Sequence, residues 1–476
     1  MNKYHTMMKE VLSDLSKAIG FLLGLLGDIC NSIVDAFEKK KGFNSEFGHE
    51  SSIGSRYNKG LLYSKHRKLT RKKSFENVLV SGPTGSGKTT KILLKSVFSL
   101  KGVSLIINDP SKEFYQLASG YLSRFFKILP LNWSDNTISS GFNLLSLIKK
   151  PNDINRVAHL LTASLDKGNS DPFWSLSVKT LLQVFIRLVL YQPEQYRNMA
   201  NVLYILNNFA ANPKKVDAWI AKTKDEKLTL DYKALISIPD KTLQNIIASA
   251  KAALQLFEDP EIAKTTSVNT INFDELRKKP TIIFLHSSIS DQKYVSVLNG
   301  IFFEQLYGHL LKRLPEKNEL DLFIILEEAS STYVPLLPLA LANCRKHRVG
   351  NLICVQSPGQ LRTMYKDEAD NITSNCISKI FLPGQTDMDT LREIETLSGK
   401  CIYKDDKGIE RVKPLMTVDE IRLLPENRSL ILSGNKPLIK GRTSPYYKSY
   451  KYRKYAQIPP IPLQGDIPDE PIALMP

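Results

Sequence analysis

Cysteine is scarce in this sequence. Five cysteines occur in 476 residues, and none stands in a CxxC pair or near histidines at the spacing of metal ligands. This distribution argues against a structural zinc site and against a disulfide framework, and it fits a reducing cytosol.

Long apolar runs are also missing. A membrane span needs ~18 to 20 uninterrupted apolar residues, whereas the closest candidate, residues 18–26, stops at Asp28. Residues 1–17 are polar and partly acidic, which is unlike a cleavable signal peptide. We therefore expect neither a transmembrane helix nor a leader in this sequence.

Acidic residues are in the minority. The sequence has 48 Asp and Glu against 65 Lys and Arg, a formal net charge of +17 at pH 7. Such an excess favours a polyanionic partner, either nucleic acid or an anionic membrane, although it also aids solubility. The 42% hydrophobic and 24% charged content is that of a soluble globular protein. The length predicts two or three domains.

Two segments precede the main body. Residues 1–41 are predicted to form an amphipathic helix, which either lies on a membrane or partner helix or packs on this protein's own body. Its apolar face is formed by Leu12, Leu15, Ile19, Leu22, Leu23, Leu26, Ile29, Cys30, Ile33 and Phe37. Residues 42–74 are predicted to be a linker that ends in a basic cluster, either a solvated turn or a contact with phosphates. The cluster consists of Lys65, Arg67, Lys68, Arg71, Lys72 and Lys73.

The main body is predicted to be an α/β fold with a mostly parallel sheet. Short apolar runs typical of buried strands alternate with helical stretches. They cover residues 77–80, 104–108, 127–131, 281–286, 322–326, 351–355 and 378–382. Strand signals are absent over residues 150–270, which predicts an all-α domain inserted between two parts of a motor domain, 75–149 and 271–447.

The last part, 448–476, is predicted to be an extended tail. It is rich in tyrosine and lysine and then in proline and acidic residues. The tyrosines either stack on nucleic-acid bases or belong to a tail packed over the sheet. They are Tyr446, Tyr447, Tyr450, Tyr452 and Tyr455.

A P-loop follows the first predicted strand. Residues 82–89 match GxxxxGK[ST] and lead into a helical pattern, the context that gives the motif its meaning. The glycines let backbone N–H groups point at phosphate oxygens, Lys88 would reach the β- and γ-phosphates, and Thr89 would hold Mg²⁺. The predicted ATP-binding residues are Gly82, Pro83, Thr84, Gly85, Ser86, Gly87, Lys88, Thr89 and Thr90.

Further candidate catalytic residues follow two later strands. Glu327 and Glu328 end the apolar run 322–326, so that one carboxylate would reach Mg²⁺ with Thr89 and the next would deprotonate the attacking water. Gln356 ends the run 351–355 and would sense the γ-phosphate. Arg345, between the two strands, is either an arginine finger for a neighbouring subunit or part of a basic surface turn. A lone histidine, His286, is expected to be structural.

Several motifs together resemble those of the conjugative coupling proteins, the type IV secretion ATPases related to the additional-strand motors. The resemblance spans residues 75–447. It covers residues 108–113 with Tyr115 (DPKGE-x-Y), 142–145 (xNPL), 171–174 (an aromatic opening of the helical domain), 356–365 (QSxxQLxxxY), and 417–425 with 445–447 (the closing strand region). Two positions differ from the family pattern, because Ser111 replaces the usual Gly and Glu327 the usual Asp.

The resemblance implies a RecA-like motor domain and a ring of six subunits, with nucleotide between subunits and DNA in the central channel. It also implies that the all-α domain meets relaxase-bound DNA, the relaxosome. Most relatives carry N-terminal transmembrane helices, so the resemblance implies a separate membrane protein as partner and a cytoplasmic location at the inner face of the bacterial membrane.

The function expected from the sequence is therefore ATP-driven DNA transfer through a conjugation channel. Two sibling motors remain as alternatives, a chromosome-segregation translocase and a secretion ATPase that moves protein. A nucleotide-gated cargo adaptor with slow hydrolysis is an alternative from another class.

Overall fold

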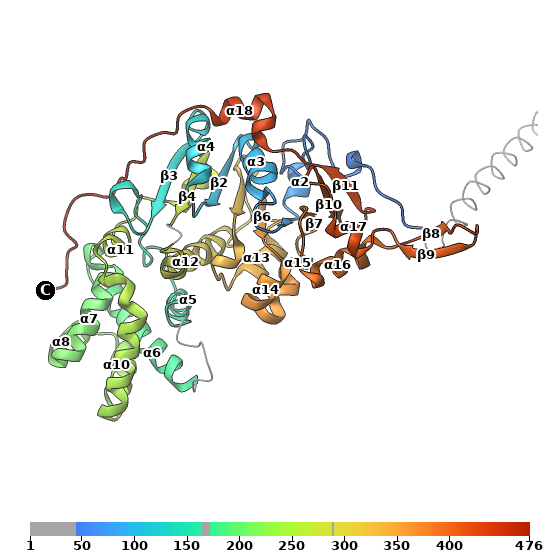
Figure 1. The fold of residues 1–476 in the computed structure, drawn as a ribbon. Coiled ribbons are helices and arrows are strands. Elements are labelled where there is room, and N and C mark those ends of the chain that lie inside the picture. The colour runs from blue at the N-terminus through green and yellow to red at the C-terminus, as the bar shows by residue number, and fades with distance from the viewer. Residues whose placement is uncertain (1–43, 164–171, 288–289) are drawn as a thin grey trace, which may run out of the picture.

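The structure is a computed structural model that describes residues 44–163, 172–287 and 290–476 (Figure 1). The predicted N-terminal helix, residues 1–41, and Asp171 lie outside these described residues.

A nine-stranded sheet in the order β11-β10-β7-β1-β6-β5-β2-β4-β3 forms the centre of the molecule. Its strands are β1 (Val78–Ser81), β2 (Val103–Asn108), β3 (Lys127–Asn132), β4 (Thr281–His286), β5 (Asp321–Leu326), β6 (Val349–Val355), β7 (Ser378–Phe381), β10 (Arg428–Ser433) and β11 (Ile439–Arg442). The strands from β7 to β3 pair in parallel, and β10 and β11 add an antiparallel edge. The predicted mostly parallel sheet is confirmed, because each of the seven predicted runs forms one of its strands.

Helices cover both faces of the sheet (Figure 1). Alternate side chains of β1 enter different cores, since Val78 and Val80 belong to one apolar cluster and Leu79 to the other. One face carries η2 (Lys88–Leu93), α3 (Leu94–Ser99), α4 (Glu113–Leu122) and α18 (Tyr450–Ala456). The other face carries α12 (Gln292–Leu310), α13 (Leu337–Asn343), α14 (Pro358–Tyr365) and α15 (Ala369–Ser374). Burial on both faces explains why the parallel strands are continuous apolar runs.

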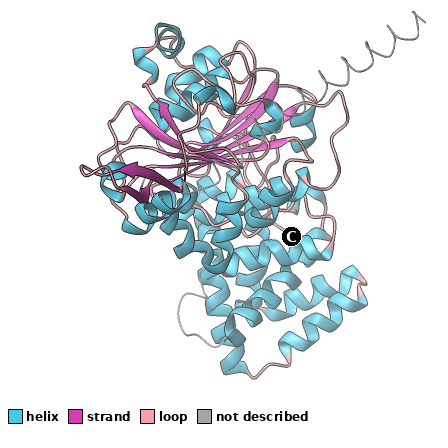
Figure 2. Cartoon of the chain, turned by 90° about the vertical axis from the view of Figure 1, so that its right-hand side faces the viewer, coloured by secondary structure: helices cyan, strands magenta, loops and turns pink. Residues whose placement is uncertain are grey.

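A helical domain lies between β3 and β4 in the sequence and extends away from the sheet (Figure 2). It contains α5 (Pro151–Thr162), α6 (Pro172–Leu190), α7 (Met199–Ala211), α8 (Pro213–Thr223), α9 (Glu226–Ile236), α10 (Asp240–Leu254) and α11 (Pro260–Thr265). Asn143 precedes the first helix of this domain. Its Nδ2 donates to the carbonyl of Arg197 (2.7 Å), between α6 and α7, and to the carbonyl of Ser267 (3.4 Å), after α11, so it connects the two ends of the domain.

Helix α6 is, among the described residues, the one helix whose length and apolar composition would suffice to cross a membrane. Its side chains Val178, Leu181 and Phe185 are fully buried in the apolar cluster of the helical domain. We therefore describe α6 as the core helix of this domain.

Residues 44–74 do not form the linker expected from their composition. Leu61, Leu62 and Tyr63 are fully buried in the same apolar cluster as Val78 of β1. Part of the basic cluster also belongs to this packed segment, because Arg71 forms an ion pair with Asp321 at 3.0 Å. The segment packs without regular secondary structure over most of its length, which is why neither helical nor strand periodicity marks it.

The C-terminal part is packed where the sequence predicted an extended tail. It begins with α18, in which Tyr452 is buried and Tyr455 stacks on Tyr121 with ring centroids 3.7 Å apart. For these two tyrosines the packed alternative is confirmed. Residues 457–476 then continue in extended form. A separate hairpin, β8 (Lys400–Lys404) and β9 (Glu410–Pro414), projects from the other end of the molecule (Figure 1).

Candidate active site

The P-loop connects β1 to η2 with two glycines in the left-handed region. Gly85 has φ 81° and Gly87 has φ 90°, so that a side chain at either position would be strained. Gly82 leaves little room for a side chain, because a Cβ there would lie 2.5 Å from Ser86 Oγ and 3.0 Å from Leu382 Cβ. The loop thus has the curled backbone that the motif predicts.

Two side chains of the loop have polar groups suited to an anion. Lys88 Nζ donates to the carbonyls of Gly82 (2.6 Å) and Pro83 (3.4 Å), which holds the ammonium group over the loop. Ser86 Oγ is buried and has no hydrogen-bond partner. Because a buried hydroxyl without a partner is costly, Ser86 fits a loop that donates to phosphate oxygens.

Thr89 and Glu327 meet at the carboxyl edge of the sheet, where Thr89 Oγ1 donates to Glu327 Oε1 at 2.6 Å. Burial, and next to it the charges of Glu113 and Glu328, raise the pKa of Glu327 to about 7, although the hydrogen bond from Thr89 opposes this. A threonine hydroxyl and a carboxylate are oxygen ligands of the kind that Mg²⁺ prefers, so this pair fits the predicted magnesium site.

Glu328 and Gln356 are also brought together. β6 lies between β1 and β5 in the sheet, so the residues that follow β5 and β6 meet beside the P-loop. Gln356 Nε2 donates to Glu328 Oε2 at 3.4 Å, and Ser330 Oγ donates to the other carboxylate oxygen. Gln356 N donates to Gln360 Oε1 at 2.9 Å, which links the family's two glutamines.

A buried carboxyl group, that of Asp109, follows β2. Because β2 and β6 flank β5 in the sheet, Asp109 and Gln356 lie on opposite sides of Glu327. Asp109 accepts hydrogen bonds from the backbone N–H groups of Phe114 (3.1 Å) and Tyr115 (2.8 Å) at the start of α4. Burial above all, together with the charge of Glu327, raises the pKa of Asp109 to about 7. His286 packs beside it fully buried, and burial lowers the pKa of His286 to about 4, in line with the expected structural role.

A cleft of about 1030 Å³ opens beside the P-loop. One wall is the loop itself, including Pro83, Thr84 and Thr90. The facing wall comes from the C-terminal part of the motor domain and was not predicted from the sequence. It includes Arg422, Arg428, Arg442, Tyr447 and Lys448. The signal that could have found it is the family segment 445–447, which closes the predicted motor domain and contributes Pro445 and Tyr447 to this wall.

Lys91 fixes these two walls to each other. Its Nζ donates to the carbonyls of Ser86 (2.6 Å) and Glu426 (3.0 Å), and burial lowers its pKa. The buried ammonium group therefore connects the P-loop to the segment that closes the cleft.

Arg345 does not join this site within one chain. It lies before β6 at the amino edge of the sheet, 69% exposed, with one ion pair to Glu76 at 3.4 Å. Its neighbour Arg348 is held by Asp321 and by the carbonyls of Glu316 and Glu319.

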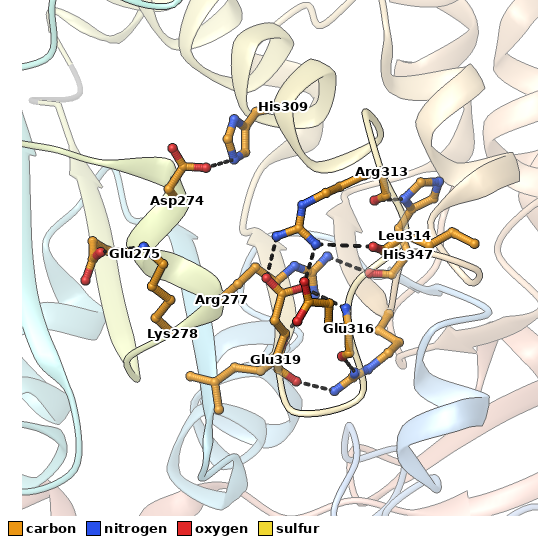
Figure 3. Close-up of polar contacts among 12 residues, drawn as sticks. Asp274, Glu275, Arg277, Lys278, His309, Arg313, Leu314, Glu316, Glu319 and His347 are labelled. Carbon is orange, nitrogen blue, oxygen red and sulfur yellow. Dashed lines mark hydrogen bonds and ion pairs between the residues drawn. The ribbon is translucent and has the colours of Figure 1, made fainter.

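Polar contacts around His347, drawn in Figure 3, anchor the turn that carries these two arginines. Arg277 donates to the carbonyls of Leu320 (2.8 Å) and His347 (2.6 Å). Arg313 pairs with Glu319 beside it. In this turn Arg348 is fixed, whereas Arg345 points to solvent.

Comparison with known proteins identifies the family. The family model described as "Type IV secretory system Conjugative DNA transfer" matches residues 39–462. The chain is 24% identical over 406 residues to the protein VirD4 of Rhizobium radiobacter, covering 78% of this chain and 56% of that protein. It is 21% identical over 449 residues to the conjugal transfer protein TraG of Escherichia coli, covering 81% and 69%. The chain spans 56–62% of the length of the VirD4 relatives that it matches.

Solved structures of a plasmid coupling protein, TrwB, share the fold. The complex of TrwB with GDPNP has a TM-score of 0.66 and 17% identity, covering 86% of this chain and 92% of that chain. The complex with ADP and Mg²⁺ has a TM-score of 0.65 and 19% identity, covering 84% and 91%. The predicted fold, a RecA-like P-loop domain with an all-α domain, is confirmed. Since the family match extends over residues 39–462 and the P-loop, Glu327 and Gln356 meet at one edge of the sheet, the chain belongs to the type IV secretory system family of conjugative DNA transfer, the coupling proteins.

Proposed function

We propose that this protein is an ATP-driven motor that recruits relaxase-bound DNA and drives its transfer through a type IV secretion channel. The observation that carries the proposal is the contact between Thr89 and Glu327 at 2.6 Å, with Glu328 and Gln356 beside it. A P-loop threonine joined to a carboxylate at the end of another strand of the same sheet, here β5 with β6 between it and β1, is the arrangement that nucleotide hydrolysis needs.

The nucleotide would be ATP with Mg²⁺. Residues 82–90 would cradle the phosphates, and the cleft beside them would take the rest of the nucleotide. Thr89 and Glu327 would hold Mg²⁺, which when bound neutralises the charge of the phosphates. TrwB has been solved with ADP and Mg²⁺, which supports this assignment.

Glu328 would act as the general base. Its carboxylate is oriented by hydrogen bonds from Ser330 and Gln356, so it can accept a proton from a water molecule held at its Oε2 side. Lys88 would stabilise the negative charge that develops on the transferred phosphoryl group. Gln356, which contacts Glu328 directly, would report the state of the site to α14.

The motor would act as a ring of six subunits with DNA in its channel. The net charge of +17 supports a polyanionic substrate. Arg345 is the proposed finger for a neighbouring subunit's site, because its side chain is 69% exposed and lacks the contacts that fix Arg348. We infer a cytoplasmic position at the inner face of the bacterial membrane, docked on a separate membrane protein.

Hydrolysis by the purified protein with and without single-stranded DNA tests the proposal. Lys88→Ala and Glu328→Gln should each lower turnover by about 10² to 10³-fold, and DNA should stimulate the unsubstituted protein. Lys222→Ala, an exposed position on α8, is the matched control and should leave turnover unchanged. Bound ATP without turnover, in the presence of DNA, would instead support a nucleotide-gated adaptor.

A further inference from the structure

The extended segment after α18 is attached to the motor domain along α4. Ile458, Ile461 and Leu463 pack against the core on that face of the sheet. Gly120 lets the segment approach, since a Cβ there would lie 2.0 Å from the carbonyl oxygen of Pro459. In Figure 1 the segment then runs past the β3 side of the sheet and ends beside the helical domain.

The segment crosses between the two domains at Gly465. Its N–H donates to the carbonyl of Thr137 at 2.9 Å, and the N–H of Asp466 donates to that of Ser139 at 3.1 Å. A Cβ at Gly465 would lie 2.7 to 2.8 Å from three carbonyl oxygens, so only glycine fits this crossing. Beyond it, Asp466 accepts from Thr270 Oγ1 at 2.6 Å and Asp469 pairs with Lys264 at 2.7 Å.

The far end of the segment is docked on α7 and α8. Asn201 Nδ2 donates to the carbonyl of Ala473 (2.9 Å), and Asn201 Oδ1 accepts from the N–H of Met475 (2.9 Å). Met475 is 2% exposed and belongs to the core of the helical domain. Trp219 Nε1 donates to the oxygen of Pro476 at 3.1 Å.

These contacts have the form of peptide recognition. One amide side chain binds the donor and the acceptor of an extended backbone, and a neighbouring pocket buries one apolar side chain. Asn198, which caps α7, fixes the amide, because its Oδ1 accepts from Asn201 Nδ2 at 3.1 Å. The docked segment has prolines at 468, 471 and 476. Prolines restrict the free segment, so docking costs less conformational entropy.

We propose that the surface formed by α7 and α8 is a peptide-binding site, which residues 473–476 of this chain occupy in the structure. Its ligand class is an extended segment that carries a large apolar residue at the position of Met475. A proline-rich, acidic stretch would precede that residue and contact Thr270 and Lys264 outside this surface, as Asp466 and Asp469 do here. A partner protein with such a segment would bind to the helical domain by displacing residues 473–476 of this chain.

Binding of a labelled synthetic peptide, residues 464–476, to full chains tests this proposal. The chain's own segment acts at an effective concentration on the order of millimolar, so the unsubstituted chain should bind the peptide at least about tenfold more weakly than a chain with a released segment. Gly465→Ala releases the segment by steric clash at the crossing, and Met475→Asp releases it at the pocket. A peptide that carries the Met475→Asp change should not bind.

Asn201→Ala introduced into either released chain should abolish binding, while thermal unfolding checks that each chain remains folded. Hydrogen exchange gives a second readout, because the Met475 amide should be protected in the unsubstituted chain and exchange rapidly in Asn201→Ala. No binding to either released chain at 1 mM peptide, roughly the effective concentration in cis, would overturn the proposal. Equal binding with and without Asn201 would also overturn it.

Discussion

Asp109 is a buried carboxyl group whose titration should be visible in stability. Its folded-state pKa of about 7 lies above the ordinary value of 3.8 because burial disfavours the charged form. The folded protein therefore holds a proton that the unfolded chain releases between these values. This contribution to stability is complete below pH 3.8 and is lost as the pH rises to about 7.

Asp109→Asn should reduce the pH dependence of the free energy of unfolding between pH 4 and 7, and the part due to Glu327, whose pKa is also raised to about 7, should remain. The variant should be less stable than the parent at low pH, since the amide can accept only one of the two backbone N–H groups that Asp109 binds. Denaturant unfolding at several pH values measures both effects. Asp389→Asn, at an exposed position of α16 (Met388–Ser398), is the control and should leave the slope unchanged.

Arg277 illustrates a buried charge with a structural role. The residue is 6% exposed, and its guanidinium group donates to the carbonyls of Leu320 and His347 (Figure 3). Arg277→Met should destabilise the protein by about 1 to 3 kcal/mol, because two part-buried carbonyls lose charged donors. Lys278→Met, one residue away with a surface pair to Glu275, should cost at most about 0.5 kcal/mol. Equal unfolding midpoints for the two variants would contradict this reasoning.

At the scale of elements, the strands of the parallel sheet and the residues that follow them could be predicted, because apolar runs mark the strands and a fixed motif marks the P-loop. Every strand of the parallel part was predicted because burial on both faces leaves continuous apolar runs. Thr89, Glu327 and Gln356 follow such strands, and parallel strands end at one edge, so their proximity could be inferred. Residues 44–74 were misread as a linker, because a segment that packs irregularly leaves no period in the sequence.

Substitutions in that segment test its role in the core. Leu62→Ala should lower the free energy of unfolding by about 2 to 5 kcal/mol, as expected for a fully buried leucine. Tyr57→Ala lies in the same segment at a side chain that is 75% exposed, so it should change stability by at most about 0.5 kcal/mol. Denaturant unfolding separates these outcomes, and a neutral Leu62→Ala would restore the linker interpretation.

At the scale of the whole molecule, two contacts escaped prediction: the second wall of the nucleotide cleft and the docking of Met475. Both join residues that are far apart in the chain. The wall of the nucleotide cleft comes from residues 422–448, which the fold brings back to the P-loop at residue 82. The docking of Met475 on α7 depends on Asn201, 274 positions earlier. A family motif marks residues 445–447, but no local pattern tells where either segment docks, because each contact depends on how the C-terminal part packs against the rest of the fold.

In the proposed ring, each active site would be completed by an arginine from the neighbouring subunit. Within one chain Arg345 and Glu328 lie at opposite edges of the sheet, so an arginine finger would have to act on the neighbouring subunit's site. When assembled alone, Glu328→Gln should again lower turnover by about 10² to 10³-fold, and Arg345→Ala should lower it by at least about 10³-fold. In an equimolar mixture about a quarter of the interfaces would pair an intact Glu328 with a neighbour's intact Arg345, so turnover should return in part.

The measurement is ATP hydrolysis after the two variants are dissociated, mixed and reassembled on single-stranded DNA. Lys346→Ala, exposed in the same turn, is the matched control and should be fully active without mixing. Recovery on mixing would establish that a site is completed by two subunits. If every ratio of the two variants stays inactive while rings form, Arg345 belongs to the surface turn and not to the catalytic machinery. The finger would then have to come from another arginine that reaches a neighbouring P-loop.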